Sequence, residues 1–310
     1  MIKSRKRNIS GVLLLDKPYG ISSNKALQTA KQLFFAAKCG HTGTLDPMAT
    51  GLLPICFGEA TKFSSMLLGA NKTYEATLRL GFMSTTGDAE GIISQAAATV
   101  QNPTLTECQQ ALAQFIGKIK QIPPMFSALK HHGKPLYSYA RNGEIIERQA
   151  REITIYGIQI QSLTCNELQL SIQCGTGTYI RVLAEDIGKA IGCGGAYLTE
   201  LRRTAIDRFN LSQACTLSAL ESMSASERDN SLLPIDYLLQ DCPSITLDRL
   251  SALHIQQGRN VLCPSGIHGI INNGMLVRLY NEQDLFLGLG EITTQQTIAA
   301  KRLLSQIPVY

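Results

Sequence analysis

Strict alternation of apolar and polar residues over positions 73–81 is the feature that most constrains the fold of this chain. The apolar side chains share one face of the segment and the polar ones share the other, as in a strand that is buried on one side only. The apolar positions are Tyr74, Ala76, Leu78 and Leu80. Residues 168–174 alternate in the same way. The sequence therefore predicts half-buried strands, with the Tyr74 ring on the buried face.

Helical patterns separate these strands without a regular strand–helix repeat. Apolar residues recur at helical spacing over 26–34 and over 180–191. A capping-box pattern, Thr104 with Glu107, precedes a third helix. Such a mixture is typical of an α+β fold, so we expect helices packed around a mixed or antiparallel sheet.

The length of the chain and a change in composition indicate two domains. At roughly 150 residues per domain, a chain of 310 residues gives a prior of about two. A polar stretch near residues 225–248 marks the boundary, and a hairpin-like pair of strands over 275–289 follows it. We therefore expect a larger domain at residues 1–245 and a small, mostly β domain at 246–310.

Composition excludes several classes of protein. Hydrophobic residues make up 44% of the chain and charged residues 17%, whereas disordered chains and long coiled coils are rich in charge. The net charge of +5 is too small for a histone-like protein that binds nucleic acid by bulk charge.

Cationic residues gather in one segment, residues 118–151. It contains seven cationic and two acidic side chains and so carries a charge of +5, while the rest of the chain is neutral overall. The cations are Lys118, Lys120, Lys130, Lys134, Arg141, Arg148 and Arg151. Such a patch is the electrostatic footprint of a polyanionic partner. A solvated surface loop is the alternative that the charge alone leaves open.

Neither the cysteines nor the histidines form a metal-binding pattern. The nine cysteines are odd in number, are spread along the chain and include no C-x-x-C pair, which argues against a disulfide framework and a structural zinc site. The five histidines show no i, i+4 spacing. They are His41, His131, His132, His254 and His268. We therefore expect no metal.

The N-terminal region does not have the pattern of an exported protein. The apolar run that follows the first basic residues covers only positions 12–15, which is too short for a signal peptide. No segment approaches the roughly 20 apolar residues that span a bilayer. We expect a cytoplasmic protein that does not associate with membranes.

A loop rich in glycine and proline, residues 40–54, contains a single acidic side chain, Asp46. Because Pro47 follows it, the backbone at Asp46 is restricted to extended conformations. A carboxylate in an otherwise uncharged, apolar loop requires a cationic partner or a chemical role. Asp46 is therefore the candidate catalytic group, and a simple Asp-Pro turn is the alternative.

Other catalytic signatures are missing from the sequence. It contains neither the G-x-x-x-x-G-K-[ST] phosphate-binding loop nor the G-x-S-x-G nucleophile elbow. A glycosidase with two carboxylates, Asp46 with Asp88 or Asp186, remains open, because sequence spacing does not report the distance between them.

Residues 40–54 resemble the catalytic motif of the TruB-type tRNA pseudouridine synthases, which convert the uridine at position 55 of tRNA, in the TΨC loop. Four further motifs follow in the order of the family: Asp16-Lys17-Pro18-x-Gly20-x-Ser22-Ser23, Lys72-Thr73-Tyr74-Glu75-Ala76, Gly177-Thr178-Tyr179-Ile180-Arg181 and Leu198-x-x-Leu201-Arg202-Arg203-Thr204. Ser84, Thr85 and Gly175 differ from residues common in the family. The resemblance covers essentially the whole chain and implies a pseudouridine-synthase catalytic domain followed by a small PUA-like RNA-binding domain.

The resemblance implies a role for each matching residue of the active site. Asp46 corresponds to the catalytic aspartate, and Arg181 to the cation that pairs with it and keeps it ionised. Tyr74 and Tyr179 correspond to residues that line the uracil pocket, and the Tyr74 hydroxyl is expected near the C5 proton. Leu201 corresponds to an apolar wall of that pocket.

Further residues are implied to contact RNA. His41 corresponds to a residue that fills the space left by the flipped nucleotide, since enzymes that act on a base take it out of the stack. The basic segment, at about 118–151, resembles the RNA-clasping insertion of the family. Lys130, Lys134 and Arg141 in it are the expected contacts to the RNA backbone.

The implied activity is the isomerisation of uridine to pseudouridine in the TΨC stem-loop of tRNA. Because this reaction involves no redox change and the sequence has no ligand cluster, we expect no cofactor or metal, and we also expect a monomer without an obligate protein partner. Asp46 either attacks C1′ of the ribose or removes the C2′ proton; uracil is detached, rotates and rejoins through C5. Two alternatives remain: an RNA chaperone that folds tRNA and in which Asp46 is incidental, and a pseudouridine synthase directed to another uridine.

Overall fold

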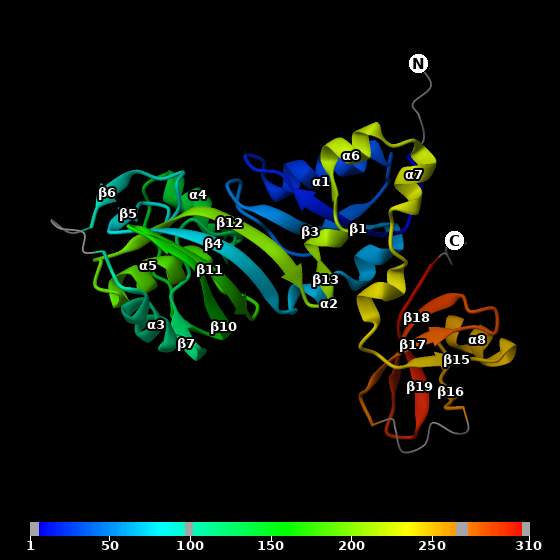
Figure 1. Ribbon diagram of the computed structural model, residues 1–310. Helices are drawn as coiled ribbons and strands as arrows, with labels where there is room; N and C mark the ends of the chain where they lie inside the picture. Colours follow the sequence, from blue (N-terminus) through cyan, green and yellow to red (C-terminus); the bar gives the residue numbers. More distant parts are fainter. Residues whose placement is uncertain (1–5, 97–101, 265–271, 306–310) are drawn as a thin grey trace.

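The computed structural model describes residues 6–96, 102–264 and 272–305. Within these residues, ten strands form one mixed sheet with the order β14-β1-β3-β12-β4-β11-β10-β7, to which β2 and β13 add at β3 and β12 (Figure 1). The strands are β1 (Gly11–Lys17), β2 (Cys39–His41), β3 (Thr50–Phe57), β4 (Lys72–Leu80), β7 (Gly117–Gln121), β10 (Arg151–Thr164), β11 (Glu167–Cys174), β12 (Ala196–Ile206), β13 (Phe209–Asn210) and β14 (Cys215–Thr216). The expected α+β fold around a mixed sheet is confirmed.

Helices cover the sheet where its apolar faces require burial. Helix α5 packs against β12 and β4, and α1 lies beside β2 and α6. The α1 helix begins at a serine cap, because the Ser22 side chain accepts a hydrogen bond from the backbone of Lys25. The main helices are α1 (Ser23–Leu33), α3 (Leu105–Ala113), α5 (Ile180–Ala190), α6 (Leu217–Ser222) and α7 (Ala225–Asn230). The smaller elements are η1 (Gly58–Phe63), α2 (Ser65–Leu68), β5 (Phe82–Ser84), β6 (Ile93–Gln95), η2 (Leu211–Gln213) and η3 (Ile235–Leu239).

The predicted alternation of β4 is confirmed and sets which side chains face α5. Tyr74 is 7% exposed and pairs with Ile172 of β11 and Arg203 of β12. Residues that pair across neighbouring strands lie on the same face of a sheet. Ala76 of β4 and Leu201 of β12 are paired in the same way. Tyr74, Arg203 and Leu201 therefore share one face of the sheet.

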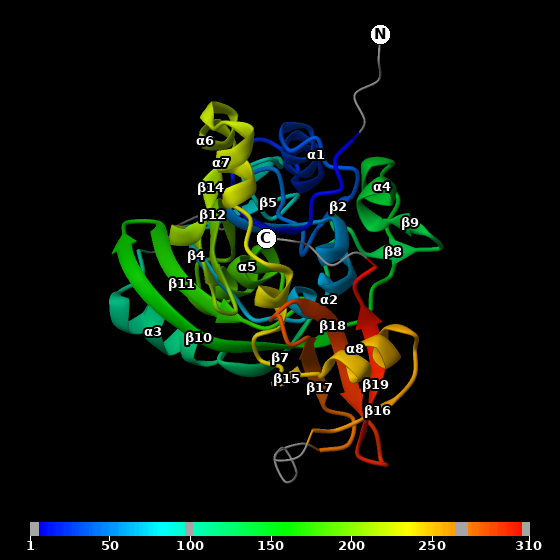
Figure 2. The same cartoon turned by 90° about the vertical axis from the view of Figure 1, so that its right-hand side faces the viewer.

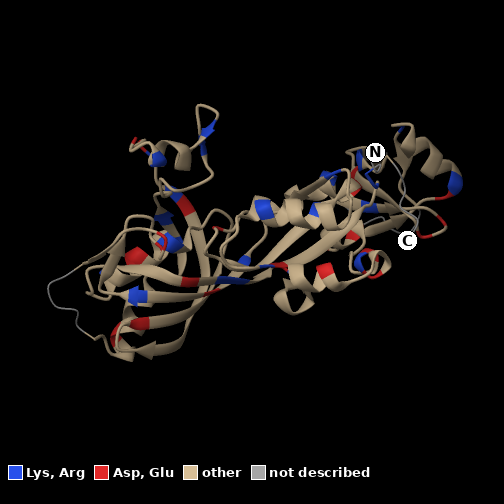
Figure 3. Ribbon diagram, turned by 90° about the horizontal axis from the view of Figure 1, so that it is seen from above, with Lys and Arg blue, Asp and Glu red and all other residues tan. Residues whose placement is uncertain are grey.

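The part of the basic segment that leaves the main sheet is shorter than the 118–151 insertion expected from the sequence. Strand β7 pairs with β10 at Gln121 and Arg151, so both ends of the expected 118–151 insertion belong to the main sheet and residues 122–150 leave it. This excursion contains β8 (Lys130–His131), β9 (Lys134–Pro135) and α4 (Leu136–Arg141). It projects beside the sheet in Figure 2, and Figure 3 shows Lys and Arg positions on it.

A small domain follows at the C-terminal end. In the described residues its sheet has the order β15-β17-β18-β19-β16, with α8 beside it. The elements are β15 (Ser244–Thr246), α8 (Arg249–Gln256), β16 (Val261–Leu262), β17 (Leu276–Tyr280), β18 (Phe286–Ile292) and β19 (Thr297–Leu303). Since β15 already belongs to this sheet, the domain begins slightly before the expected residue 246. Phe286 and Leu289 join a core cluster with Phe63 of the larger domain. No helix among the described residues could cross a membrane.

Strands β3 and β12 meet in a parallel pairing at Thr50 with Arg202 and at Gly51 with Arg203. Gly51 has a φ of +99°, and a Cβ atom at this position would lie 2.3 Å from the carbonyl oxygen of Arg203. The close approach of these strands therefore requires a glycine.

Replacing Gly51 should break this strand pairing. We expect Gly51→Ala to lower the free energy of unfolding by about 2–4 kcal/mol, through overpacking and backbone strain together. Gly40→Ala is the matched control, because nothing lies within 4 Å of a Cβ added there. Urea denaturation of both variants measures the difference; equal unfolding midpoints would show that the β3–β12 approach does not depend on Gly51.

Candidate active site

Hydrogen bonds on both sides of Asp46 fix its loop. The Ser23 side chain, on α1, accepts from the Leu45 amide and donates to the Leu45 carbonyl, each at 2.8 Å. The Pro47 carbonyl accepts from the Gly20 amide at 2.9 Å and from Lys17 Nζ at 3.3 Å. The loop is therefore held by residues of the 16–23 motif, far from it in sequence.

Arg181 is the cationic partner of Asp46. Its Nε lies 2.9 Å from a carboxylate oxygen of Asp46, and its side chain is only 5% exposed. Nη1 donates to the Thr86 carbonyl at 2.9 Å, and Nη2 donates to the Phe126 carbonyl at 2.7 Å. Because every nitrogen of the guanidinium has a partner, the orientation of Arg181 is fixed and so is that of Asp46.

Burial has a larger effect than ion pairing on the pKa of the Asp46 carboxyl. Removal from water raises the pKa of the Asp46 carboxyl above its ordinary value, while Arg181 and Lys17 lower it and the nearby Asp88 raises it further. The family resemblance implied that Arg181 keeps Asp46 ionised. Arg181 does favour the ionised form, but burial favours the neutral form and has the larger effect on the pKa. Lys17 is itself fully buried, and burial lowers its pKa to about 8.

A cavity of about 330 Å³ opens beside this ion pair. The sequence-predicted residues that it brings together are Asp46, Tyr74, Tyr179, Arg181 and Leu201. Burial raises the pKa of the Tyr74 phenol, with Arg203 opposing that effect, so the hydroxyl is neutral near pH 7. The cavity thus places a carboxylate, two aromatic rings and an apolar wall around one space, a combination suited to holding a planar polar ring.

Two buried cations of this cavity received no role from the sequence. Arg203 is 1% exposed and donates to the Leu52 carbonyl at 2.8 Å, and Lys72 Nζ donates to the Ala70 carbonyl at 2.6 Å. Burial lowers the pKa of Lys72 to about 8. For Lys72 the sequence did contain a signal of a special role. In the alternation of β4, Lys72 falls on the apolar face, where a charged side chain is costly unless it has a partner or a function.

Not every predicted residue lies at the cavity. His41 lies in β2 opposite Ile55, does not line the cavity, and has a buried Nδ1 without a hydrogen-bond partner among the described residues. Burial lowers its pKa. On the excursion, Lys130 lies in β8, Lys134 in β9 and Arg141 in α4.

The two carboxylates considered as glycosidase partners do not line the cavity. Asp88 is 2% exposed, lies 3.7 Å from Arg181 Nε, and accepts hydrogen bonds from the Thr86 hydroxyl at 2.5 Å and the Glu90 amide at 3.1 Å. Because Asp88 does not line the cavity, the structure does not place it there as a second acid beside Asp46. Asp186 lies on α5 and is likewise absent from the lining.

Metal ligands do not cluster in the part of the chain that the structure describes. It holds no group of three or more His, Cys, Asp or Glu residues that could bind an ion. His268 lies outside the described residues.

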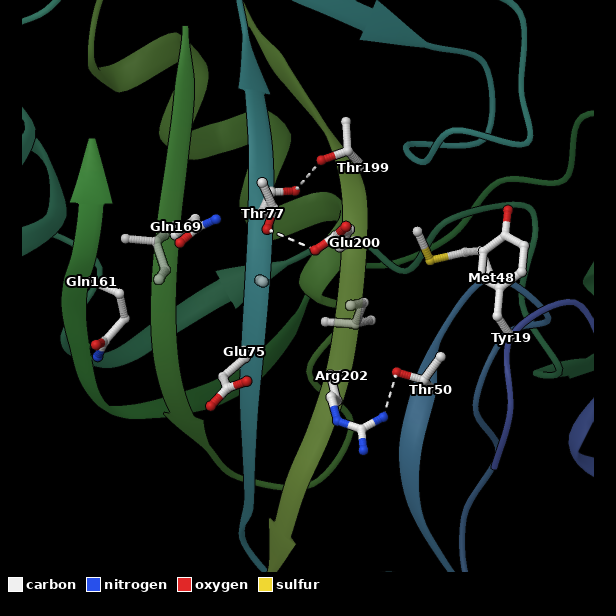
Figure 4. A pocket seen from close by; sticks show the side chains of 13 residues that line it. Tyr19, Met48, Thr50, Glu75, Thr77, Gln161, Gln169, Thr199, Glu200 and Arg202 are labelled. Atoms are coloured by element: carbon white, nitrogen blue, oxygen red, sulfur yellow. Dashed lines mark hydrogen bonds between the residues drawn. The ribbon is translucent and has the colours of Figure 1, made fainter. Parts of the chain in front are cut away.

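A larger, more polar cavity of about 600 Å³ lies on the opposite face of the sheet (Figure 4). Glu75 and Arg202 pair across β4 and β12, as do Thr77 and Glu200, and these side chains alternate with those that face α5. The Leu201 residue lines both cavities. The two spaces are therefore separated by the sheet near the β3–β12 junction.

Comparison with known families matches nearly all of the chain. The profile of the TruB family pseudouridylate synthase N-terminal domain matches residues 31–180. Two C-terminal profiles follow: tRNA pseudouridylate synthase B C-terminal domain at residues 181–240, and pseudouridine synthase II TruB, C-terminal, at residues 243–304.

Curated relatives match at high identity. The tRNA pseudouridine synthase B of Nitrosospira multiformis is 57% identical over 307 residues, which cover 98% of each chain. The protein of the same name from Nitrosomonas europaea is 54% identical and covers 94% of this chain and 95% of its own length.

Solved structures show the same fold. One is an H/ACA RNP bound to a substrate RNA containing 2′-deoxyuridine, with a TM-score of 0.70, 22% identity, and coverage of 96% of this chain and 85% of the other. A Cbf5-Nop10-Gar1 complex gives a TM-score of 0.69 at 25% identity, covering 96% and 84%.

The Asp46 carboxyl should titrate above the ordinary value of 3.8, and Asp88→Asn should lower the midpoint, because the charge of Asp88 raises it. A native pKa above the unfolded value means that this group's stabilisation is complete below the unfolded pKa and is lost as pH rises through the native pKa. Carboxyl carbon shifts in Asp-labelled protein, assigned with Asp46→Asn, measure the midpoint. Asp186→Asn is the control. A midpoint below 3.8, or one that Asp88→Asn leaves unchanged, would contradict this account.

Proposed function

The chain belongs to the TruB family of pseudouridine synthases and is a tRNA pseudouridine synthase, and we propose that its target is the uridine at position 55, in the TΨC loop. The observation that carries the proposal is the pairing of Asp46 with the buried Arg181 at 2.9 Å, beside a cavity lined by Tyr74 and Tyr179. This arrangement supplies an oriented carboxylate and a compartment for one flipped base.

The proposed reaction exchanges one glycosidic bond for another. The bond between C1′ and N1 of uracil breaks, the ring rotates, and a bond forms between C1′ and C5. The proton leaves C5, and N1 gains one, so that substrate and product contain the same atoms. Because nothing is oxidised or reduced, the reaction needs no redox cofactor, and we propose that none is used.

Asp46 is the proposed group that acts on the ribose. It either attacks C1′ as a nucleophile or removes the proton from C2′ as a base, and both routes require the carboxylate form. The bond from Arg181 Nε leaves the second oxygen of Asp46 available, and the Asp46 side chain is 35% exposed. Arg181 thus holds the carboxylate toward the cavity without covering it.

The cavity walls are the proposed site for uracil. The rings of Tyr74 and Tyr179 offer faces on which a base can stack, and Leu201 closes the apolar side. Since the Tyr74 phenol is neutral, we propose that its hydroxyl is a hydrogen-bond partner near C5.

RNA outside the cavity is the proposed partner of the excursion and of β2. Lys130, Lys134 and Arg141 lie on the segment that projects beside the sheet, where they can contact phosphates. His41, in β2 and just before the Asp46 loop, is proposed to occupy the space that the flipped nucleotide leaves. The small C-terminal domain is proposed to add RNA contacts as a PUA-like unit, in a cytoplasmic enzyme that acts as a monomer without a protein partner.

Tritium release tests the reaction and its position together. With a tRNA transcript labelled at C5 of its uridines, we expect release to reach the amount that a single uridine carries. A transcript with cytidine at position 55 should release none, because the proposed substrate is absent. Binding without release would favour the chaperone, and release from the cytidine-55 transcript would show that the enzyme modifies another uridine.

A further inference from the structure

A buried glutamine holds the backbone of Tyr179 from both sides. Gln121, the last residue of β7, is 3% exposed. Its carboxamide nitrogen donates to the Tyr179 carbonyl at 3.1 Å, and its carboxamide oxygen accepts from the Tyr179 amide at 2.8 Å. Tyr179 stands at the N-terminal cap of α5 without a side-chain cap of its own. The Gln121 carboxamide therefore satisfies both backbone hydrogen-bonding groups of Tyr179, as a neighbouring strand does for a residue in a sheet.

An arginine holds the ring of the same tyrosine. The guanidinium carbon of Arg151, the first residue of β10, lies 5.1 Å from the Tyr179 ring centroid, which is within the range of a cation–π contact. Nη2 of Arg151 donates to the Gly177 carbonyl at 2.5 Å. A Cβ at Gly177 would lie 3.4 Å from the guanidinium carbon, in ordinary van der Waals contact, so the guanidinium packs closely against this turn.

These two residues stand at the two ends of the basic excursion. Gln121 and Arg151 are paired across β7 and β10, and residues 122–150 form the loop between them. The Phe126 carbonyl, near the start of the excursion, accepts the bond from Arg181 Nη2. Residues at and next to the ends of the excursion therefore contact both Tyr179 and Arg181, the ion-pair partner of Asp46.

We propose that Gln121 and Arg151 are positioning residues that hold Tyr179 in place against the bound base. This inference rests on the proposed function, because it takes Tyr179 as a wall of the base site. Gln121 sets the backbone of Tyr179, and Arg151 sets its ring. Neither residue needs to contact the RNA.

The chemistry of the two side chains suits this role. The carboxamide of glutamine presents one donor and one acceptor in a single plane, matching a backbone N–H and C=O. The guanidinium of arginine is planar and can stack on a ring while its edge donates, whereas the ammonium of lysine is a point charge. Arg151→Lys therefore keeps the charge and removes the stacked plane.

The first experiment separates stacking from charge at Arg151. Single-turnover pseudouridine formation should slow about tenfold or more in both Arg151→Lys and Arg151→Met, because a small displacement of a positioned group is costly. The tRNA dissociation constant should stay unchanged in Arg151→Lys. Lys189→Met, which removes an exposed cation in the last turn of α5 outside the basic segment, is the control and should turn over as the parent does. A wild-type rate in Arg151→Lys, with weaker binding in Arg151→Met, would show that Arg151 is a phosphate ligand and overturn the proposal.

A double-mutant cycle tests whether Arg151 acts through Tyr179. In a Tyr179→Ala background, Arg151→Met should change the rate by less than about twofold, because the ring that it positions is gone. Equal losses in the parent and in Tyr179→Ala would mean that Arg151 acts elsewhere. Activity of the parent and of Lys189→Met shows in the same assay that the enzyme itself turns over, so a failure of the proposed function is recognised separately.

The role of Gln121 has a readout that does not depend on activity. In Gln121→Leu, the Tyr179 amide loses its acceptor, and its hydrogen exchange should accelerate about tenfold or more relative to the parent while core amides of β11 exchange as before. Unchanged exchange at Tyr179 would show that Gln121 does not hold this backbone, and would overturn its part of the proposal.

Discussion

The buried guanidinium of Arg181 is the interaction on which the rest of the site depends. A charge removed from water is costly unless every donor finds a partner. Arg181 meets this requirement by joining three segments that are distant in sequence: the Asp46 loop, the Thr86 carbonyl and the Phe126 carbonyl at the start of the excursion. One side chain thus orients the proposed catalytic carboxylate and ties the RNA-facing segment to it.

The sequence predicted the parts of the site that follow from local patterns. The alternation of β4 placed Tyr74 on the buried face, and a lone carboxylate in an apolar loop indicated that Asp46 needs either a cationic partner or a chemical role. That this partner is Arg181 came only from the resemblance, because residue 181 lies on α5 and no periodicity records a pairing across 135 positions. The loop's own support from Ser23 is likewise a tertiary contact that local patterns do not encode.

Other features could not be read from the sequence because burial decides them. Gln121 follows two lysines of an exposed strand and gives no sign that its side chain is 3% exposed. The ends of the basic segment looked like part of an excursion, because charge density does not distinguish a solvated strand from a loop. The pKa of the Asp46 carboxyl also depends on burial, which raises it, whereas Arg181 lowers it. Catalytic carboxyls are commonly found in such opposed environments.

The comparison of Asp46→Asn with the parent enzyme tests the central claim most directly, with single-turnover rate and tRNA affinity measured on the same samples. Asn keeps the shape of the side chain and removes the charge that both chemical routes require, so the rate should fall by several orders of magnitude. Affinity for tRNA and the midpoint of thermal unfolding should change little, because Asn keeps the shape of the side chain and its amide oxygen can still accept a hydrogen bond from Arg181 Nε. Pseudouridine formation at a near-parental rate would contradict the account.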